Sequence, residues 1–204
     1  MNVKVCGITT NEQINALSKL DVQMVGLNFY PRSKRYIKDN NDLKENINSN
    51  LKRVGVFVNS SKDDILAKRE IYQLDYAQLH GDEDYNFCSE LSKDISLIKV
   101  WRVKSQPDEN IIHHYDDIIS FHLFDTYTEE YGGSGKSFNW KLIEDLDLKK
   151  PIMLSGGISP EHTKILNRIN NENIWGVDIN SRFETSPGIK DIEMIESFTK
   201  QLKS

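Results

Sequence analysis

The sequence predicts an α/β protein and, more closely, a single (β/α)8 barrel that spans residues 1–204. Two observations carry this prediction. Short β-branched, apolar runs alternate with stretches of helical hydrophobic spacing, a pattern typical of parallel strands. There are eight such runs, and the smallest barrels of this type have roughly 200 residues. A doubly wound sheet, the alternative, usually has only about six strands.

The predicted strands share an apolar run bounded by polar or turn-forming residues. In chain order they cover 3–6, 24–29, 54–58, 76–79, 97–101, 118–124, 152–154 and 175–179. Helical spacing between them is clearest in four stretches, 14–20, 65–72, 142–146 and 165–169. Two Asn-rich segments, 39–50 and 167–173, are expected to be loops or helix ends, because Asn is a poor residue inside a helix.

Helix starts support this division of the chain. Thr9 with Glu12 fits a capping box before the first apolar stripe. Ser61 precedes a second predicted helix, and Ser159 stands before Pro160 at a third. The helices are therefore expected to begin close to these residues.

Composition narrows the class of protein. The chain has 31 acidic and 26 basic residues, a net charge of −5, so no basic excess indicates a nucleic-acid partner. No run of 18 apolar residues and no signal-peptide pattern occur, which predicts a cytoplasmic protein without a membrane partner. Two cysteines, Cys6 and Cys88, are too few for a disulfide scaffold.

Polar and reactive side chains gather at the carboxyl ends of the predicted strands, where barrels of this class place their chemistry. In chain order these positions are Cys6, 28–35, Asn59, His80, Arg102, Asp125, 155–157 and 178–182. The amino ends of the same strands are ordinary. This asymmetry indicates an enzyme.

The last two of these loops have the chemistry of an anion site. Gly156 and Gly157 allow backbone amides to approach a ligand, although a Gly-Gly pair alone is as typical of a plain turn. Ser181 and Arg182 are expected to open a short extra helix whose N–H groups face an anion. Because loops after strands seven and eight commonly bind phosphate in barrels, we expect a phosphate site here.

Cys6 and Asp125 end strands one and six, so they face the same barrel mouth and form a candidate base and acid for a small substrate. Taken alone, a buried Cys is more typical of core packing, and an Asp-Thr after a strand is more typical of a turn. A free thiol with a pKa near 8.5 is only a few per cent ionised at pH 7. Lys4, two residues before Cys6 on the same strand face, is expected to supply a nearby cation.

Two other patterns are weaker. Residues 132–137 resemble half of a phosphate-binding P-loop, but Glu130 stands where the motif needs Gly. The clusters at 80–83 and 113–116 lack the ligand spacing of a known metal site. We therefore expect neither a metal nor a nucleotide cofactor, and we expect structural roles for those histidines and carboxylates.

Seven collinear motifs together resemble those of the phosphoribosylanthranilate isomerase family. They are Lys-Val-Cys-Gly-Ile-Thr at 4–9, the segment 26–36, Val-Gly-Val-Phe-Val-Asn at 54–59, Gln-Leu-His-Gly at 78–81, Phe-Asp-Thr at 124–126 with 131–138, Leu-Ser-Gly-Gly-Ile at 154–158, and 176–178 with Glu184 and 186–188. The resemblance covers nearly the whole chain.

The resemblance implies a cofactor-free enzyme of tryptophan biosynthesis that performs an Amadori rearrangement of N-(5′-phosphoribosyl)anthranilate. It implies that Asp125 is the general acid and Cys6 the general base, and that Arg35 engages the anthranilate group. It places Gln78, His80, Asp178, Gly156, Gly157, Ser181 and Arg182 among the substrate-binding residues. The expected partner is a small phosphorylated substrate, and the expected oligomeric state is a monomer or a homodimer.

Arg182 departs from the family pattern, which usually has Gly after the two residues that match Asn180 and Ser181. Either a non-glycine residue at 182 does not adopt the same backbone, or its guanidinium adds a direct phosphate contact. Two alternatives stay open from the sequence. One is another phosphate-binding barrel, such as a histidine-pathway sugar isomerase. The sequence pattern of those isomerases has an Asp base and two half-barrel repeats. The other is a non-catalytic phosphate-binding barrel.

Overall fold

Eight parallel strands form a closed barrel in the computed structural model, which describes residues 1–38, 42–44, 50–105, 107–126, 140–143 and 146–202. Each strand pairs with the next in chain order, and the first pairs with the eighth. The strands are β1 (Asn2–Cys6), β2 (Met24–Asn28), β3 (Lys52–Phe57), β4 (Tyr76–Leu79), β5 (Ser96–Val103), β6 (Phe121–Thr126), β7 (Ile152–Leu154) and β8 (Ile174–Ile179). The predicted barrel is confirmed, and the doubly wound sheet is wrong.

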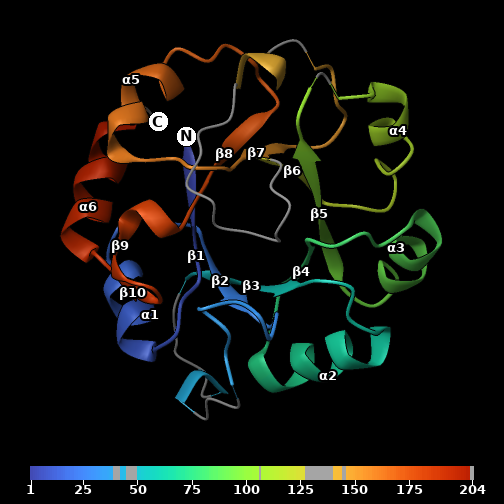
Figure 1. Cartoon of the computed structure of the whole chain (residues 1–204), viewed down its shortest axis with the longest axis horizontal. Coiled ribbons are helices and arrows are strands. Elements are labelled where there is room, and N and C mark those ends of the chain that lie inside the picture. The colour runs from blue at the N-terminus through green and yellow to red at the C-terminus, as the bar shows by residue number, and fades with distance from the viewer. Residues whose placement is uncertain (39–41, 45–49, 106, 127–139, 144–145, 203–204) are drawn as a thin grey trace.

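Helices surround this barrel on the outside (Figure 1). They are α1 (Asn11–Leu17), α2 (Lys62–Tyr72), α3 (Tyr85–Leu91), α4 (Glu109–His113), α5 (Thr163–Leu166) and α6 (Ile192–Gln201). Short 3-10 turns are η1 (Asp42–Lys44), η2 (Trp140–Ile143), η3 (Pro160–His162) and η4 (Ser181–Phe183). Between η4 and α6, β9 (Glu184–Ser186) and β10 (Ile189–Lys190) form a small antiparallel hairpin. Among the helices that the structure describes, none has the length and apolar character needed to cross a membrane.

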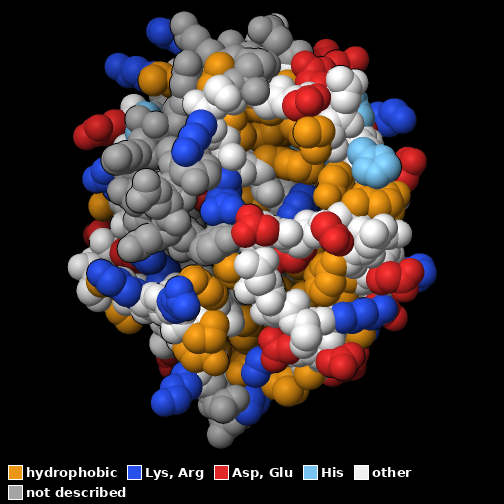
Figure 2. All heavy atoms as spheres, turned by 45° about the vertical axis from the view of Figure 1, so that its right-hand side comes forward, with side chains coloured by type: hydrophobic (Ala, Val, Ile, Leu, Met, Phe, Trp, Pro, Cys, Tyr) orange, Lys and Arg blue, Asp and Glu red, His pale blue; other side chains and the backbone are white. Residues whose placement is uncertain are grey.

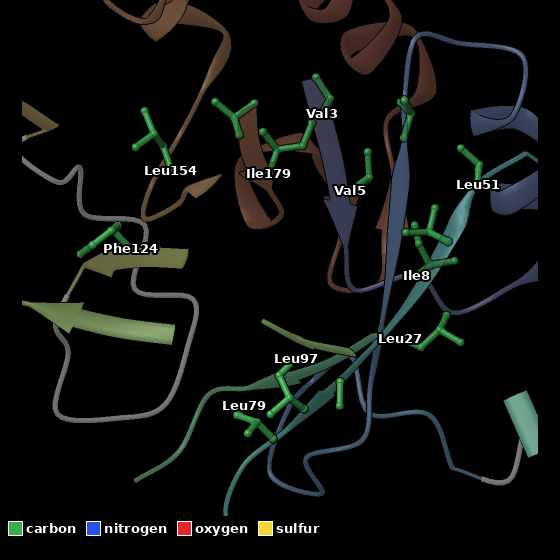
Figure 3. Packing of buried hydrophobic residues seen from close by; sticks show 14 of the residues in the cluster. Val3, Val5, Ile8, Leu27, Leu51, Leu79, Leu97, Phe124, Leu154 and Ile179 are labelled. Carbon is green, nitrogen blue, oxygen red and sulfur yellow. The ribbon is translucent and has the colours of Figure 1, made fainter. Parts of the chain in front are cut away.

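Side chains alternate between the two faces of the barrel wall. Outward-facing residues such as Val3 and Val5 belong to the main core, which lies between strands and helices and includes Leu27 and Ile179 (Figure 3). The intervening residues face the interior, where a second cluster contains Met24, Val54, Ile98, Val100, Phe121, Leu123 and Met153. Alternate residues of one strand therefore have different surroundings. The outward-facing set packs against the helices, and the inward-facing set fills the barrel interior and lines its mouth.

The sequence located helix starts better than helix ends. Ser61 and Ser159 do stand at the N-caps of α2 and η3. The first cap is Thr10, whose side chain accepts a hydrogen bond from the Gln13 amide, so the expectation for Thr9 is wrong by one residue. The hydroxyl of Thr9 instead donates to the carbonyl of Gly188, 2.7 Å away, and ties the start of α1 to the hairpin.

The helix expected over 165–169 is shorter than its apolar spacing suggests. α5 ends at Leu166, and the Asn-rich segment that follows is a loop, as expected. In that loop, the side-chain amide of Asn171 donates to the carbonyl oxygens of Ile143 and Leu146 at 3.3 and 3.0 Å. The strand expected from Ile118 begins only at Phe121, since Ile118 still belongs to the turn that follows α4.

The histidines near residue 113 have a structural role on the outer side of β5 and β6. Trp101 donates to Nδ1 of the fully buried His122, whose Nε2 lies 2.8 Å from Asp116. Asp116 also pairs with His113 at 2.9 Å. Burial lowers the pKa of His122, in keeping with a neutral ring that accepts from Trp101. Burial opposes the charge on Asp116, but the two histidine hydrogen bonds outweigh it and lower the pKa of this carboxyl.

Closure of the barrel depends on a glycine in β8. A Cβ at Gly176 would lie 2.1 Å from the carbonyl oxygen of Asn2 in β1, a backbone atom that cannot rotate away. We expect Gly176→Ala to lower the free energy of unfolding by at least about 2 kcal/mol, measured by urea titration. The control Ile174→Val, which removes one methylene from the same strand, should cost about 1 kcal/mol. A Gly176→Ala protein as stable as wild type would contradict the packing at this seam.

Candidate functional site

Cys6 lies at the carboxyl end of β1, and its thiol points into the barrel mouth beside β2. The residue is 6% exposed. Its register partner is Gly26, where a Cβ would come within 2.8 Å of the thiol sulfur. Glycine at this position therefore makes the space that the thiol occupies.

Lys4 and Asp178 form a buried ion pair directly behind Cys6. They are register partners on β1 and β8, and Nζ of Lys4 lies 2.9 Å from Oδ2 of Asp178. Burial alone would lower the pKa of Lys4, but Asp178 and Cys6 outweigh it and raise that pKa. Burial raises the pKa of Asp178, against the effect of Lys4. The cation expected next to Cys6, Lys4, is therefore present. It also pairs with the carboxylate of Asp178, a partner that sequence spacing did not predict.

Burial decides the resting state of the thiol. Burial raises the pKa of Cys6, the nearby charges of Lys4, Lys190 and Arg35 act to lower it, and Asp178 acts to raise it. The net direction is upward, so in the free protein Cys6 is a protonated thiol at neutral pH. Any step that uses it as a base needs charges or a substrate that favour the thiolate.

Asp125, His80 and Gln78 form the facing part of the mouth. Asp125 belongs to β6, and its Oδ2 lies 3.3 Å from Nε2 of His80, which follows β4. Nδ1 of the same ring lies 3.3 Å from the side-chain amide of Gln78 on β4. The charges of Asp125 and His80 both act on the pKa of Asp178, so this group and the Cys6 group share one mouth.

Three buried polar atoms in the mouth have no hydrogen-bond partner among the residues that the structure describes: Oε1 of Gln78, Oδ1 of Asp178 and Nε2 of His80. The two oxygens point to a ligand. A buried oxygen without a partner is costly, and a bound molecule with hydroxyl groups would satisfy both. The structure thus brings together Cys6, Asp125, Gln78, His80 and Asp178, five of the residues named from the sequence.

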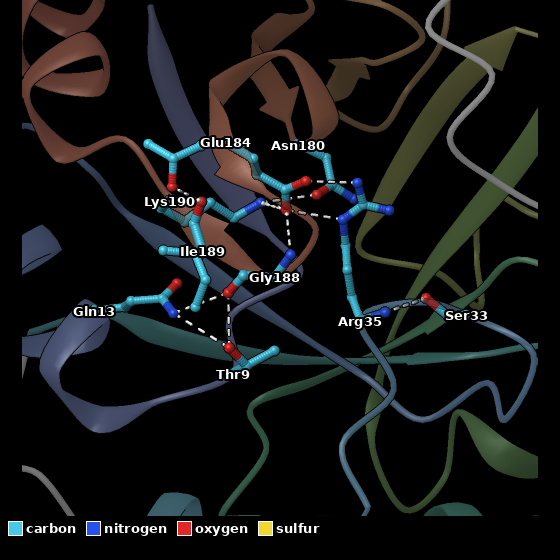
Figure 4. Close-up of polar contacts among 10 residues, drawn as sticks. Thr9, Gln13, Ser33, Arg35, Asn180, Glu184, Gly188, Ile189 and Lys190 are labelled. Carbon is cyan, nitrogen blue, oxygen red and sulfur yellow. Dashed lines mark hydrogen bonds and ion pairs between the residues drawn. The ribbon is translucent and has the colours of Figure 1, made fainter.

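Arg35 reaches the mouth from the loop after β2, and the structure adds partners that the sequence did not suggest. Its Nε and Nη2 bind the carboxylate of Glu184 at 2.8 and 2.6 Å (Figure 4). Lys190 lies 2.7 Å from the same carboxylate and 2.8 Å from Oδ1 of Asn180. In the sequence, Glu184 is visible only as part of a motif and Lys190 has no visible signal, since neither stands at the end of a barrel strand.

The expected phosphate loops follow β7 and β8, which are neighbours in the barrel. Gly156 and Gly157 both have positive φ angles, 87° and 67°, in the region that favours glycine. Residues 181–183 form the expected short helix, η4, with Arg182 exposed. The motif at 131–138 lies outside the described residues.

The remaining strand-end residues serve the rim of the barrel. Arg102 pairs with Asp82 at 2.6 Å, and the side chain of Asn59 accepts from the Asp82 amide. Cys88 is fully buried in the core, where burial raises its pKa to about 11. On the face shown in Figure 2, lysine and arginine side chains are interspersed with aspartate and glutamate.

Comparisons with known proteins agree with this geometry. A family model described as N-(5'phosphoribosyl)anthranilate (PRA) isomerase matches residues 3–201. A relative from Parabacteroides distasonis, an N-(5'-phosphoribosyl)anthranilate isomerase, is 36% identical over 99% of this chain and 93% of its own length. The crystal structure of the Thermotoga maritima isomerase is 36% identical, with a TM-score of 0.87 over 98% of each chain.

A further solved structure was determined in complex with reduced 1-(o-carboxyphenylamino)-1-deoxyribulose 5-phosphate. It is 32% identical to this chain, covers 98% of it and 97% of its own length, and has a TM-score of 0.82. The resemblance read from seven short motifs is therefore confirmed over the whole chain. The chain belongs to the N-(5'-phosphoribosyl)anthranilate isomerase family.

Proposed function

We propose that the chain converts N-(5′-phosphoribosyl)anthranilate into 1-(2-carboxyphenylamino)-1-deoxyribulose 5-phosphate, in tryptophan biosynthesis. The observation that carries the proposal is the presence of a thiol from β1 and a carboxyl from β6 in one barrel mouth, where the charges of both neighbourhoods meet at Asp178. The reaction is an aldose-to-ketose isomerisation, in which the sugar is oxidised at C2′ and reduced at C1′. It needs an acid and a base, both of which this chain's own residues supply.

Asp125 is the proposed general acid. It protonates the furanose ring oxygen, the bond from that oxygen to C1′ breaks, and the nitrogen lone pair forms a Schiff base with C1′. His80, 3.3 Å from Oδ2 of Asp125, holds the carboxyl toward the mouth. The side-chain amide of Gln78 lies 3.3 Å from the other ring nitrogen of His80, Nδ1, and this contact orients the ring.

Cys6 is the proposed general base. Its thiolate removes the proton from C2′, and the electron pair forms the C1′–C2′ double bond of an enolamine while the Schiff-base nitrogen becomes neutral. The enolamine tautomerises to the ketone as C1′ takes a proton. Lys4, which shares its charge between Asp178 and Cys6, favours the thiolate in a site where burial opposes it.

Charged groups at both ends hold the sugar between acid and base. Arg35 binds the anthranilate carboxylate, for which a guanidinium is well shaped. Amides of Gly156, Gly157 and η4 bind the phosphate, with Arg182 as an added contact. Oε1 of Gln78 and Oδ1 of Asp178 accept from sugar hydroxyls. Positioning of this kind is the main contribution that a protein without a cofactor makes to an isomerisation.

The proposal extends to the domain organisation, the oligomeric state and the location of the protein that the sequence predicts. We propose that residues 1–204 act as one domain, as a monomer or a homodimer, in the cytoplasm. Sedimentation at micromolar concentration measures the oligomeric state directly.

Removal of the acid or the base should abolish turnover. We expect Cys6→Ser and Asp125→Asn each to lower kcat by roughly 10²- to 10⁴-fold, measured by the loss of fluorescence of phosphoribosylanthranilate generated in situ. Cys88→Ala, which removes the other thiol, and Asp21→Asn, an exposed carboxylate, are the matched controls and should turn over as wild type does. Full activity in either site variant would overturn the role given to that residue.

The charges behind Cys6 should move its titration in opposite directions. We expect Lys4→Met to raise the apparent pKa of Cys6 and Asp178→Asn to lower it, because the first removes a stabilising cation and the second a repelling anion. The measurement is the rate of iodoacetamide alkylation against pH, with Cys6 followed by peptide mass mapping to separate it from Cys88. If the pH profile of alkylation is unchanged in both variants, the proposed role of Lys4 is wrong.

Arg182 should contribute to phosphate affinity. We expect Arg182→Gly, the residue usual in the family pattern, to raise KM about tenfold with little change in kcat, because one charge-assisted contact is lost at a distance from the reacting carbons. The check is steady-state kinetics of both proteins in the same buffer. If KM and kcat both stay unchanged, Arg182 has no special role.

A further inference from the structure

Arg35 is held at the mouth by a network of described residues from three separate segments. Glu184 in β9 binds it through two parallel hydrogen bonds, and Lys190 in β10 and Asn180 after β8 complete the network. Figure 4 shows Glu184 and Lys190 reaching from the hairpin toward Arg35, which comes from the opposite side. The Glu184 side chain is 3% exposed and that of Lys190 is fully buried, whereas Arg35 is 13% exposed.

The network leaves one edge of the Arg35 guanidinium open. Nε and Nη2 donate to Glu184, and Nη1 makes no hydrogen bond among the described residues. In Figure 4 this third nitrogen points away from Glu184. Because the guanidinium is rigid and planar, fixing two of its nitrogens also fixes the direction in which the third one donates.

Charge within the network favours an anion at that open edge. Glu184 carries one negative charge between two cations, Arg35 and Lys190, so the cluster keeps a net positive charge. Hydrogen bonds and the charge of Glu184 raise the pKa of Arg35 against the opposing effect of burial. Burial opposes the charge on Glu184, but Arg35 and Lys190 outweigh it and lower the pKa of this carboxyl.

The surrounding backbone is shaped for the same arrangement. Gly7, with a φ of 79°, lies under the Arg35 side chain, and a Cβ there would come within 2.5 Å of Cδ of Arg35 and 2.8 Å of Oδ1 of Asn180. The amide of Gly188 donates to Oε1 of Glu184 at 3.2 Å, which holds the carboxylate from the hairpin side. Arg35 is thus supported along its stem and at its head.

We propose that Glu184 is a positioning residue for substrate recognition: it aims Nη1 of Arg35 at the aromatic carboxylate of the substrate. This inference rests on the proposed function of the site. It predicts that Glu184 controls the anthranilate end of the ligand and has no effect on the phosphate end.

The deciding variant is Glu184→Gln, which keeps the size of the side chain and removes its charge. If Glu184 only neutralised the site, this variant would bind an anionic substrate more tightly. As a positioning residue, its loss should raise KM by about tenfold to a hundredfold in spite of the added positive charge, with a smaller change in kcat. Thr185→Ala, an exposed position in the same hairpin, is the control and should behave as wild type.

Two ligands separate positioning from general support of the fold. Calorimetry should show weakened binding of reduced 1-(o-carboxyphenylamino)-1-deoxyribulose 5-phosphate to Glu184→Gln, and unchanged binding of ribulose 5-phosphate, which lacks the aromatic carboxylate. In an Arg35→Met background, Glu184→Gln should have no further effect, because the two residues act as a unit.

Equal weakening of both ligands, additive effects of the two substitutions, or a Glu184→Gln protein with wild-type KM would each overturn the proposal. Failure of the proposed function is a separate outcome. It would appear as a wild-type protein that does not consume phosphoribosylanthranilate in the fluorescence assay.

Discussion

The buried ion pair between Lys4 and Asp178 joins the first and last strands of the barrel at the level of the site. Loss of one partner from such a pair typically costs about 3–5 kcal/mol, because the other charge is left buried and alone. The pair fixes β1 against β8, and the two functional segments follow directly from those strands. Cys6 comes two residues after Lys4, and η4 and the β9–β10 hairpin begin just after Asp178.

This constraint explains how a protein with a net charge of −5 can form a site for a multiply charged anion. Among the described residues of the mouth, Asp178 neutralises Lys4, whereas Arg35 and Lys190 share the single carboxylate of Glu184. Only the second group keeps a surplus positive charge. Positive charge is therefore in excess beside Arg35, where the proposed substrate carries its carboxylate, and charges of both groups act on the pKa of Cys6.

Sequence periodicity was enough to predict the barrel, since each strand buries an apolar set on its outer face, and Val3 and Val5 alternate with Lys4 and Cys6. It also predicted which side chains meet at the barrel mouth, because strand ends are visible as changes from apolar to polar residues. Helix ends were less predictable. α5 ends at Leu166, before its apolar spacing does, and Asn171 in the loop that follows makes hydrogen bonds to residues 143 and 146 that no local pattern reveals. The pairing of Arg35 with Glu184 joins positions 149 residues apart, which spacing alone does not reveal.

A crystal structure with the reduced product analogue would show the orientation of the substrate in the mouth. We expect the aromatic carboxylate on Nη1 of Arg35, the phosphate against Gly156, Gly157 and η4, and C2′ about 3–3.5 Å from the thiol sulfur of Cys6. A ligand bound in the reverse direction, with its phosphate on Arg35 and C2′ away from Cys6, would contradict this orientation.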